Sequence, residues 1–131
     1  MSGGRLKRSF LFAGGQPVLA LTTTGRKSGA ARSTVIACMP DGDVLVVVPS
    51  NAGQDRPPAW WLNLQADPQA EVDFRGEHRV VLARRASAEE ESLLWPRILE
   101  QYSGFAQYRR MNNREIPVVI LERERAFTSA A

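Results

Sequence analysis

The sequence has few of the side chains that usually perform acid–base, nucleophilic or metal-dependent chemistry. Among its 131 residues there is one cysteine, Cys38, and one histidine, His78. A single cysteine excludes an intramolecular disulfide, as is typical of proteins from a reducing cytoplasm, and one Cys with one His is too few ligands for a metal cluster. No nucleophilic serine motif is present either. We therefore predict a cytoplasmic protein without a metal and, if it is an enzyme, a cofactor that performs the reaction.

Long apolar runs and nucleic-acid motifs are missing as well. No stretch is long enough for a transmembrane helix, we expect no signal peptide, and the length predicts a single domain, 1–131. The basic, apolar segment Arg5–Phe12, in an N-terminal lead (1–16), is too short to anchor the chain; weak association with an anionic membrane surface stays open as an alternative. The net charge of +3 favours acidic small molecules or such a surface, and we expect no nucleic-acid partner.

The most informative feature that the chain does have is the segment 22–32, between two apolar runs typical of strands. It contains two glycines, four hydroxyl side chains and three cations, Arg26, Lys27 and Arg32. Glycines let backbone N–H groups turn towards a ligand, hydroxyls donate and cations supply charge, so the loop suits a phosphate-like anion. A solvated basic hairpin is the alternative, but residues 1–40 hold six basic residues and no acidic one, which favours anion binding. The spacing of a nucleotide-hydrolysing P-loop is absent.

Hydrophobic periodicity and turn residues predict a mainly β chain with few helices. The expected strands are 17–23, 33–39, 43–48, 70–74, 79–84 and 117–121, with hairpin turns at Asp41-Gly42 and Gly76-Glu77. Helices are expected at 59–64, after a capping box that starts at Ser87, and at 104–110. In the second of these we expect Leu93 on the apolar side and a kink at Pro96. Short strands joined mainly by hairpins predict an antiparallel barrel.

Two further segments offer aromatic surfaces. Trp60 and Trp61 point in different directions from one helix, so one of them can pack on a flat ring, and Asn63 is available for a hydrogen bond. Two tryptophans anchored beneath a loop are an equally good interpretation. One helical face further along carries aromatic residues at steps of three, which form either core or the wall of a ligand site: Tyr102, Phe105 and Tyr108.

Four segments together resemble the deazaflavin-dependent nitroreductase family, which uses coenzyme F420 and includes F420H2-dependent quinone reductases of actinobacteria. The four are Leu21–Gly29 with Arg32, Asp41-Gly42 leading to Val48–Asn51, Pro58–Leu64 with Pro68, and Arg114–Glu122. Their order and spacing, over nearly the whole chain, carry the resemblance. It implies a split β-barrel fold, related to the flavin-binding pyridoxamine-phosphate-oxidase barrels.

The resemblance also implies where coenzyme F420 binds. Its phosphate and the start of its oligoglutamate tail would be held by the basic loop, at Arg26, Lys27, Ser28, Gly29 and Arg32. The deazaflavin ring would lie against the segment Pro49, Ser50 and Asn51, with Trp60 and Asn63 packed beside the cofactor. Because F420 carries a phosphate and several carboxylates, it presents more negative charge than FMN, which agrees with the cationic loop.

The acceptor site implied by the resemblance consists of Ala37 and the aromatic stripe of Tyr102, Phe105 and Tyr108. The middle position of the stripe is Phe here rather than Tyr, and Ala37 stands where some members carry Tyr. The implied activity is hydride transfer from reduced F420 to a flat, electron-poor acceptor such as a quinone or a nitro compound. Ser50 and Tyr108 are the expected catalytic residues, which would polarise the acceptor oxygen.

Other functions stay open on the sequence alone. An oxidoreductase of the same barrel type could use FMN, and a protein of this kind could bind a deazaflavin without any turnover. A monomer and a homodimer are equally compatible with the sequence.

Overall fold

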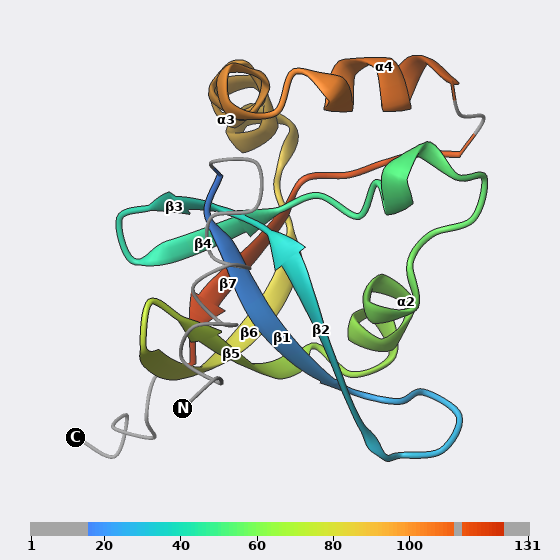
Figure 1. The fold of residues 1–131 in the computed structure, drawn as a ribbon, viewed down its shortest axis with the longest axis vertical. Helices are drawn as coiled ribbons and strands as arrows, with labels where there is room; N and C mark the ends of the chain where they lie inside the picture. Colours follow the sequence, from blue (N-terminus) through green and yellow to red (C-terminus); the bar gives the residue numbers. More distant parts are fainter. Residues whose placement is uncertain (1–15, 112–113, 125–131) are drawn as a thin grey trace.

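A computed structural model describes residues 16–111 and 114–124, and Figure 1 shows how they are arranged. The basic segment Arg5–Phe12 lies outside the described residues. Seven strands form one curled antiparallel sheet in the order β2-β1-β5-β6-β7-β4-β3. The strands are β1 Val18–Thr24, β2 Ala31–Ala37, β3 Met39–Asp41, β4 Val44–Val47, β5 Gln69–Phe74, β6 Glu77–Arg85 and β7 Val119–Arg123.

Three of the six strand pairings in the sheet are hairpins, and the other three join strands that lie further apart in the sequence. β1 pairs with β2, β3 with β4 and β5 with β6. β1 also pairs with β5 through Leu21 and Val72, while β7 lies between β6 and β4. The prediction of hairpin-joined antiparallel strands is confirmed. The β1–β2 loop extends beyond the sheet, on the side where the helix Ala59–Ala66 lies (Figure 1).

Two apolar clusters fill the two faces of the curled sheet. β4 is buried on both faces, as its unbroken apolar sequence predicts, because Leu45 and Val47 belong to one cluster and Val46 to the other. The first cluster also holds Trp60. The second lies against the helix after β6 and includes Ile98, which is 1% exposed.

Three helices cover the sheet: α2 Ala59–Ala66, α3 Ala88–Gln101 and α4 Gly104–Met111. α2 begins directly after Pro58, and α3 has the predicted capping box, in which Ser87 Oγ accepts from the N–H of Glu90 and Glu90 Oε1 accepts from the N–H of Ser87. Pro96 lies inside α3, which continues to Gln101. No helix within the described ranges is long and apolar enough to cross a membrane.

Several details of the expected secondary structure are wrong. The two hairpin turns lie one residue from their expected places, at Gly42-Asp43 and Arg75-Gly76, because Asp41 pairs with Val44 and Phe74 pairs with Glu77. The strand expected at 33–39 is two strands, because the chain leaves β2 after Ala37 and Met39–Asp41 pairs with β4 instead. Cys38 lies at this break, where its N–H donates to the carbonyl of Pro17 and its side chain is buried. Leu93 does not pack on the apolar side of α3 but is 70% exposed, since its neighbour Leu94 takes the inward position.

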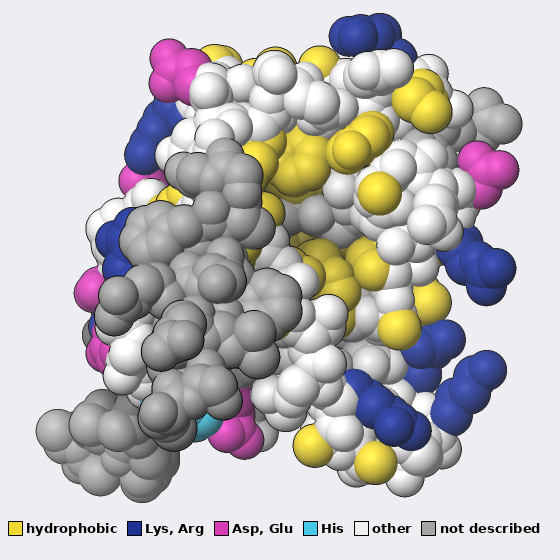
Figure 2. Space-filling model, viewed as in Figure 1, with side chains coloured by type: hydrophobic (Ala, Val, Ile, Leu, Met, Phe, Trp, Pro, Cys, Tyr) yellow, Lys and Arg dark blue, Asp and Glu magenta, His cyan; other side chains and the backbone are white. Residues whose placement is uncertain are grey.

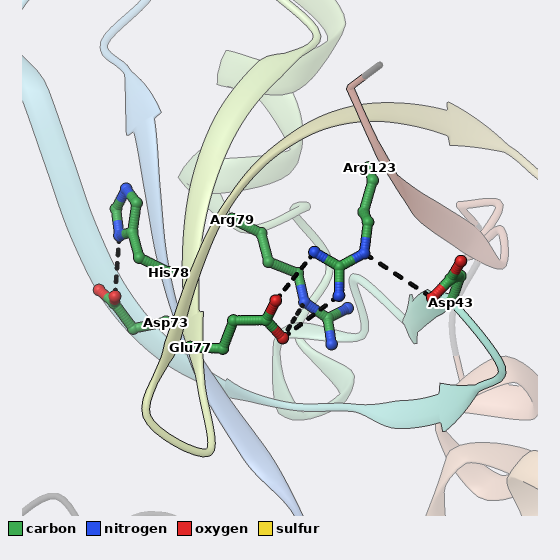
Figure 3. Close-up of polar contacts among 6 residues, drawn as sticks. All are labelled: Asp43, Asp73, Glu77, His78, Arg79 and Arg123. Carbon is green, nitrogen blue, oxygen red and sulfur yellow. Dashed lines mark hydrogen bonds and ion pairs between the residues drawn. The ribbon is translucent and has the colours of Figure 1, made fainter. Parts of the chain in front are cut away.

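Polar contacts hold the β5–β6 hairpin to the strands beside it (Figure 3). The guanidinium groups of Arg79 and Arg123 converge on the carboxylate of Glu77, at 3.1 and 3.0 Å, and Arg123 also lies 3.7 Å from Asp43. His78 is exposed, and its Nδ1 lies 2.8 Å from Asp73 Oδ1. On this surface each of these basic groups has an acidic partner.

Candidate active site

An open cavity of about 610 Å³ lies between the β1–β2 loop, the segment that leads into α2, and α2 itself. Its size is in the range of small-molecule sites. In the view of Figure 2, Lys and Arg side chains gather at the lower right, where Figure 1 places the β1–β2 loop. The predicted cofactor residues that line the cavity are Arg26, Lys27, Ser28, Arg32, Asn51, Trp60 and Asn63. The structure thus brings together seven residues predicted from three separate segments.

Hydrogen bonds within the β1–β2 loop fix its conformation. The N–H of Gly25 donates to the carbonyl of Ala30 at 2.7 Å, and the N–H of Gly29 donates to the carbonyl of Gly25 at 2.8 Å. Ser28 Oγ accepts from the N–H of Ala30. The N–H groups of Gly25 and Gly29 are therefore used inside the loop and are not available to an anion.

Asn63, on α2, connects this helix to the β1–β2 loop through its side-chain amide. Its side chain is 3% exposed, its Oδ1 accepts from the backbone N–H and from Nη1 of Arg26, both at 3.1 Å, and its Nδ2 donates to Thr23 Oγ1 at 3.0 Å. A buried amide whose donor and acceptor atoms are both used is held in one orientation. Asn63 therefore sets the direction in which the Arg26 side chain leaves the loop.

The cations that line the cavity have no acidic partner among the described residues. None of the ion pairs there includes Arg26, Lys27 or Arg32, and none includes Arg56, which lines the cavity from the segment before α2. The side chains of the three loop residues are exposed. Four cations around one cavity create a positive potential that an anionic ligand can neutralise.

The segment Pro49–Gln54 makes a tight turn at the edge of the cavity. The N–H of Gly53 donates to the carbonyl of Ser50, and Asn51, Ala52 and Gly53 all have positive φ, at 48°, 54° and 83°. Asn51 lines the cavity, whereas Pro49 and Ser50 are buried and do not. Positive φ at two successive non-glycine residues is uncommon and needs support from the surroundings.

The predicted acceptor residues lie beyond this turn, and none of them lines the cavity. Tyr102 and Phe105 stack with ring centroids 5.3 Å apart, and Phe105 and Tyr108 lie 6.0 Å apart, so the stripe is continuous. A Cβ placed on Gly53 would lie 2.9 Å from Cδ1 of Tyr108, which shows how closely this ring packs on the turn. Of the two predicted catalytic residues, Ser50 therefore lies in this turn and Tyr108 packs against it.

Tyr102 also has a structural contact that the sequence did not indicate. Its hydroxyl donates to the carbonyls of Pro17, at 2.9 Å, and Cys38, at 3.2 Å. Burial raises the pKa of Tyr102 to about 12; the charge of the Cys38 side chain acts in the same direction, and the hydrogen bond with the Cys38 backbone opposes it. Ala37 is partly buried at the end of β2, one residue before this contact. Tyr102 is thus fixed as a neutral side chain at one end of the stripe.

Sequence reasoning missed two arginines near the site. Arg56 lines the same cavity as the loop cations, and its place two residues before Pro58 and the start of α2 was the available signal. Arg114 donates to three carbonyls of the Pro49–Gln54 turn. It stands in a segment that carried the family resemblance, but no local pattern could connect it to a turn 60 residues earlier.

Comparison with known proteins gives the family. The model of the family described as F420H(2)-dependent quinone reductase matches residues 2–123. The chain belongs to this family. It is 33% identical to the F420H(2)-dependent quinone reductase Rv1261c of Mycobacterium tuberculosis over 113 residues, which are 84% of this chain and 76% of the relative.

Solved structures agree with this assignment. A structure of an F420-H2 dependent reductase, FDR-A, superposes with a TM-score of 0.73 and 31% identity, over 81% of this chain and 94% of that one. A protein described as a domain-swapped dimer gives a TM-score of 0.74 at 27% identity, over 91% and 96% of the two chains. A pyridoxamine 5'-phosphate oxidase-like protein from Listeria innocua, with a TM-score of 0.57 and 12% identity, shares the fold alone.

These findings confirm the predicted fold class and family. The chain is a split-barrel protein of mainly β structure, and membership of the family identifies it as an F420H2-dependent reductase with coenzyme F420 as its cofactor. The roles of single residues in this chain stay predictions.

Proposed function

We propose that this F420H2-dependent reductase reduces a quinone, with F420 bound in the cationic cavity between the β1–β2 loop and α2. The observation that carries the proposal is the set of four cavity cations without an acidic partner among the described residues. F420 brings a phosphate and carboxylates, so its charges complement those of the cavity. The donor set therefore fits this cofactor.

In the proposed complex the β1–β2 loop binds the phosphate and the start of the glutamate tail. Arg26 is the central contact because Asn63 holds its guanidinium in one direction. Lys27, Ser28, Gly29 and Arg32 complete the binding loop. Arg56 adds a cation from the segment that leads into α2. Contacts from two separate segments can orient an elongated anion as well as attract it.

The ring system would lie between α2 and the Pro49–Gln54 turn. Trp60 offers an aromatic edge on the α2 side, and Asn51 lines the cavity from the turn. A fixed turn excludes water from one face of the ring and holds the ring at a constant distance from the acceptor. Bound reduced F420 supplies a hydride for a flat, electron-poor acceptor.

The acceptor would bind beside the turn, next to the stripe of Tyr102, Phe105 and Tyr108, with Ala37 nearby. Ser50 and Tyr108 are proposed to hydrogen-bond the acceptor oxygen and so stabilise the charge that develops on it. Ala37 and Phe105 lack the hydroxyl groups that tyrosines would bring, which favours an apolar quinone over a nitro compound as the acceptor.

Fluorescence titration of the pure protein with F420, and in parallel with FMN, tests the cofactor site. We expect saturable F420 binding that is much tighter than FMN binding and that weakens as the ionic strength rises, because exposed charges are screened by salt. Absence of F420 binding, or equal binding of FMN, would contradict the proposal.

Oxidation of F420H2 with a soluble naphthoquinone and, separately, a nitroimidazole tests the acceptor. We expect turnover with the quinone, and a lower kcat with Ser50→Ala while F420 affinity is retained. F420 binding without turnover on either acceptor would instead support a carrier protein.

A further inference from the structure

Arg114 reaches the Pro49–Gln54 turn from a distant part of the chain. Its Nε donates to the carbonyl of Gln54 at 3.1 Å, its Nη1 to the carbonyl of Pro49 at 3.2 Å and its Nη2 to the carbonyl of Ser50 at 2.9 Å. One guanidinium thus connects both ends of the turn. Because the guanidinium is a rigid planar fork, three simultaneous bonds fix the carbonyls relative to one another.

The turn is a conformation that its own sequence does not favour. Asn51 and Ala52 both adopt the left-handed region, which costs a residue other than glycine free energy. Within the turn, the N–H of Gly53 donates to Ser50 and the N–H of Gln54 donates to Asn51, and Asn51 Nδ2 donates to the carbonyl of Arg56. Such a turn persists when contacts from outside hold it, and Arg114 supplies three of them.

Two contacts enclose the turn from different elements. Arg114 binds its carbonyls, and the Tyr108 ring of α4 packs against Gly53, where φ is 83° and a Cβ would come within 2.9 Å of the ring. Arg114 is not among the residues that line the cavity, so it contacts the turn without being part of the cavity wall. Burial lowers the pKa of Arg114, with Asp55 opposing the shift, and the group stays charged at neutral pH.

We infer that Arg114 is a positioning residue, whose guanidinium holds the Pro49–Gln54 turn in the conformation that presents Ser50 and Asn51 to the cofactor ring and the acceptor. The part that concerns the ring and the acceptor rests on the proposed function. The effect on the turn itself does not, because it is a property of the protein without its cofactor.

Hydrogen exchange on the cofactor-free full chain tests the effect on the turn. Wild type is compared with Arg114→Ala, with Arg114→Lys and with Arg97→Ala, a control that removes an exposed arginine paired with Asp41. We expect exchange in the peptide covering 49–56 to become about tenfold faster or more in both Arg114 variants, since the turn opens locally. Strand amides in β1 and β5 keep their protection, and Arg97→Ala matches wild type.

Arg114→Lys separates geometry from charge. A lysine keeps the positive charge but lacks the planar fork, so we expect it to behave like Arg114→Ala. Full protection of the turn in Arg114→Lys overturns the inference, because charge alone would then suffice. Equal loss of protection across β1 and β5 also overturns it, since Arg114 would then support the whole fold and not the turn.

F420 titration of the same four proteins tests the functional part. We expect both Arg114 variants to bind F420 about tenfold more weakly or worse, while Arg97→Ala binds as wild type does. If the turn loosens and the affinity does not change, the turn does not present the ring and this inference fails. If wild type binds no F420, the proposed function fails, and the exchange result still decides whether Arg114 holds the turn.

Discussion

Two regions of the described chain hold arginines that differ in their partners. Around the cavity, Arg26, Arg32 and Arg56 have no carboxylate partner among the described residues. On β6 and β7, by contrast, Arg84 binds Glu90 and Glu122, and Arg123 binds Glu77, a pair that Figure 3 shows. Both regions carry arginines, but only the second has carboxylates that balance their charge.

In the region where the charge is balanced, the arginines lower the pKa values of the carboxylates that they bind. The Arg84 hydrogen bond, followed by that of the Ser87 N–H, lowers the pKa of Glu90 to about 2. The hydrogen bond from Arg123 and then that from Arg79 lower the pKa of Glu77. Both carboxylates are exposed, and pairs of this kind contribute little to stability because water screens them. Around the cavity, uncompensated cations repel one another, so their value to the protein lies in what they bind.

The largest expected effect is on F420 affinity, when one cation without an acidic partner and one cation with such a partner are removed in turn. Arg26→Ala should weaken F420 binding about 10- to 100-fold, because a charge-assisted contact to the cofactor is lost. Arg123→Ala removes the same charge from the paired region, and we expect it to change the affinity less than about threefold. Titration of both variants with F420 checks the comparison. Equal losses of affinity would mean that only net charge matters and would remove the assigned site.

The next effect concerns the buried amide beneath the cationic loop. Asn63→Ala removes the acceptor of Arg26 and the donor to Thr23, both in a buried place. We expect the free energy of unfolding to fall by about 1–3 kcal/mol, with weaker F420 binding. Gln65→Ala, at an exposed position of the same helix, is the matched control for denaturant unfolding. A loss no greater than that of the control would show that Asn63 does not hold the loop.

The smallest effect tests the balanced region through pH. Hydrogen bonding to Asp73 is the main cause that raises the pKa of His78, with Glu71 acting in the same direction. A raised pKa in the folded state means that protonated His78 stabilises the fold below about pH 6.5, the ordinary value, and that this contribution is lost as the pH rises through the folded pKa. We therefore expect the Tm advantage of wild type over His78→Gln to shrink between about pH 5.5 and 8.5. A constant difference would contradict the assignment.

Most of the secondary structure could be predicted because its signals are local. The hairpin turn next to Gly42, predicted to within one residue, the capping box at Ser87 and the prolines before α2 each act within four residues. The break of the expected strand 33–39 could not be predicted, since an apolar run does not say that Met39 pairs with β4. Leu93 and Leu94 are both apolar, and only the packing of α3 decides which of them is buried.

In the candidate site, too, the features with local signals could be predicted and the contacts between distant segments could not. The basic loop could be recognised because its charges adjoin one another in the sequence, and the structure places three of its cations around one cavity. The contacts of Asn63 with Arg26 and of Arg114 with Ser50 span 37 and 64 residues. No periodicity or spacing along the chain encodes such contacts. The roles assigned to Ser50 and Tyr108 stay predictions for the experiments above.

By itself, the sequence determined the mainly β character of this protein, the helix starts and the placement of cationic charge in one loop, because turns, caps and charge act over a few residues. Only the tertiary structure decided that the loop and Arg56 line one cavity, that Asn63 directs Arg26, and that Arg114 and Tyr108 both contact one strained turn. The physical reason is that a hydrogen bond between distant segments depends on how the sheet curls and where its helices pack, which is a property of the whole fold.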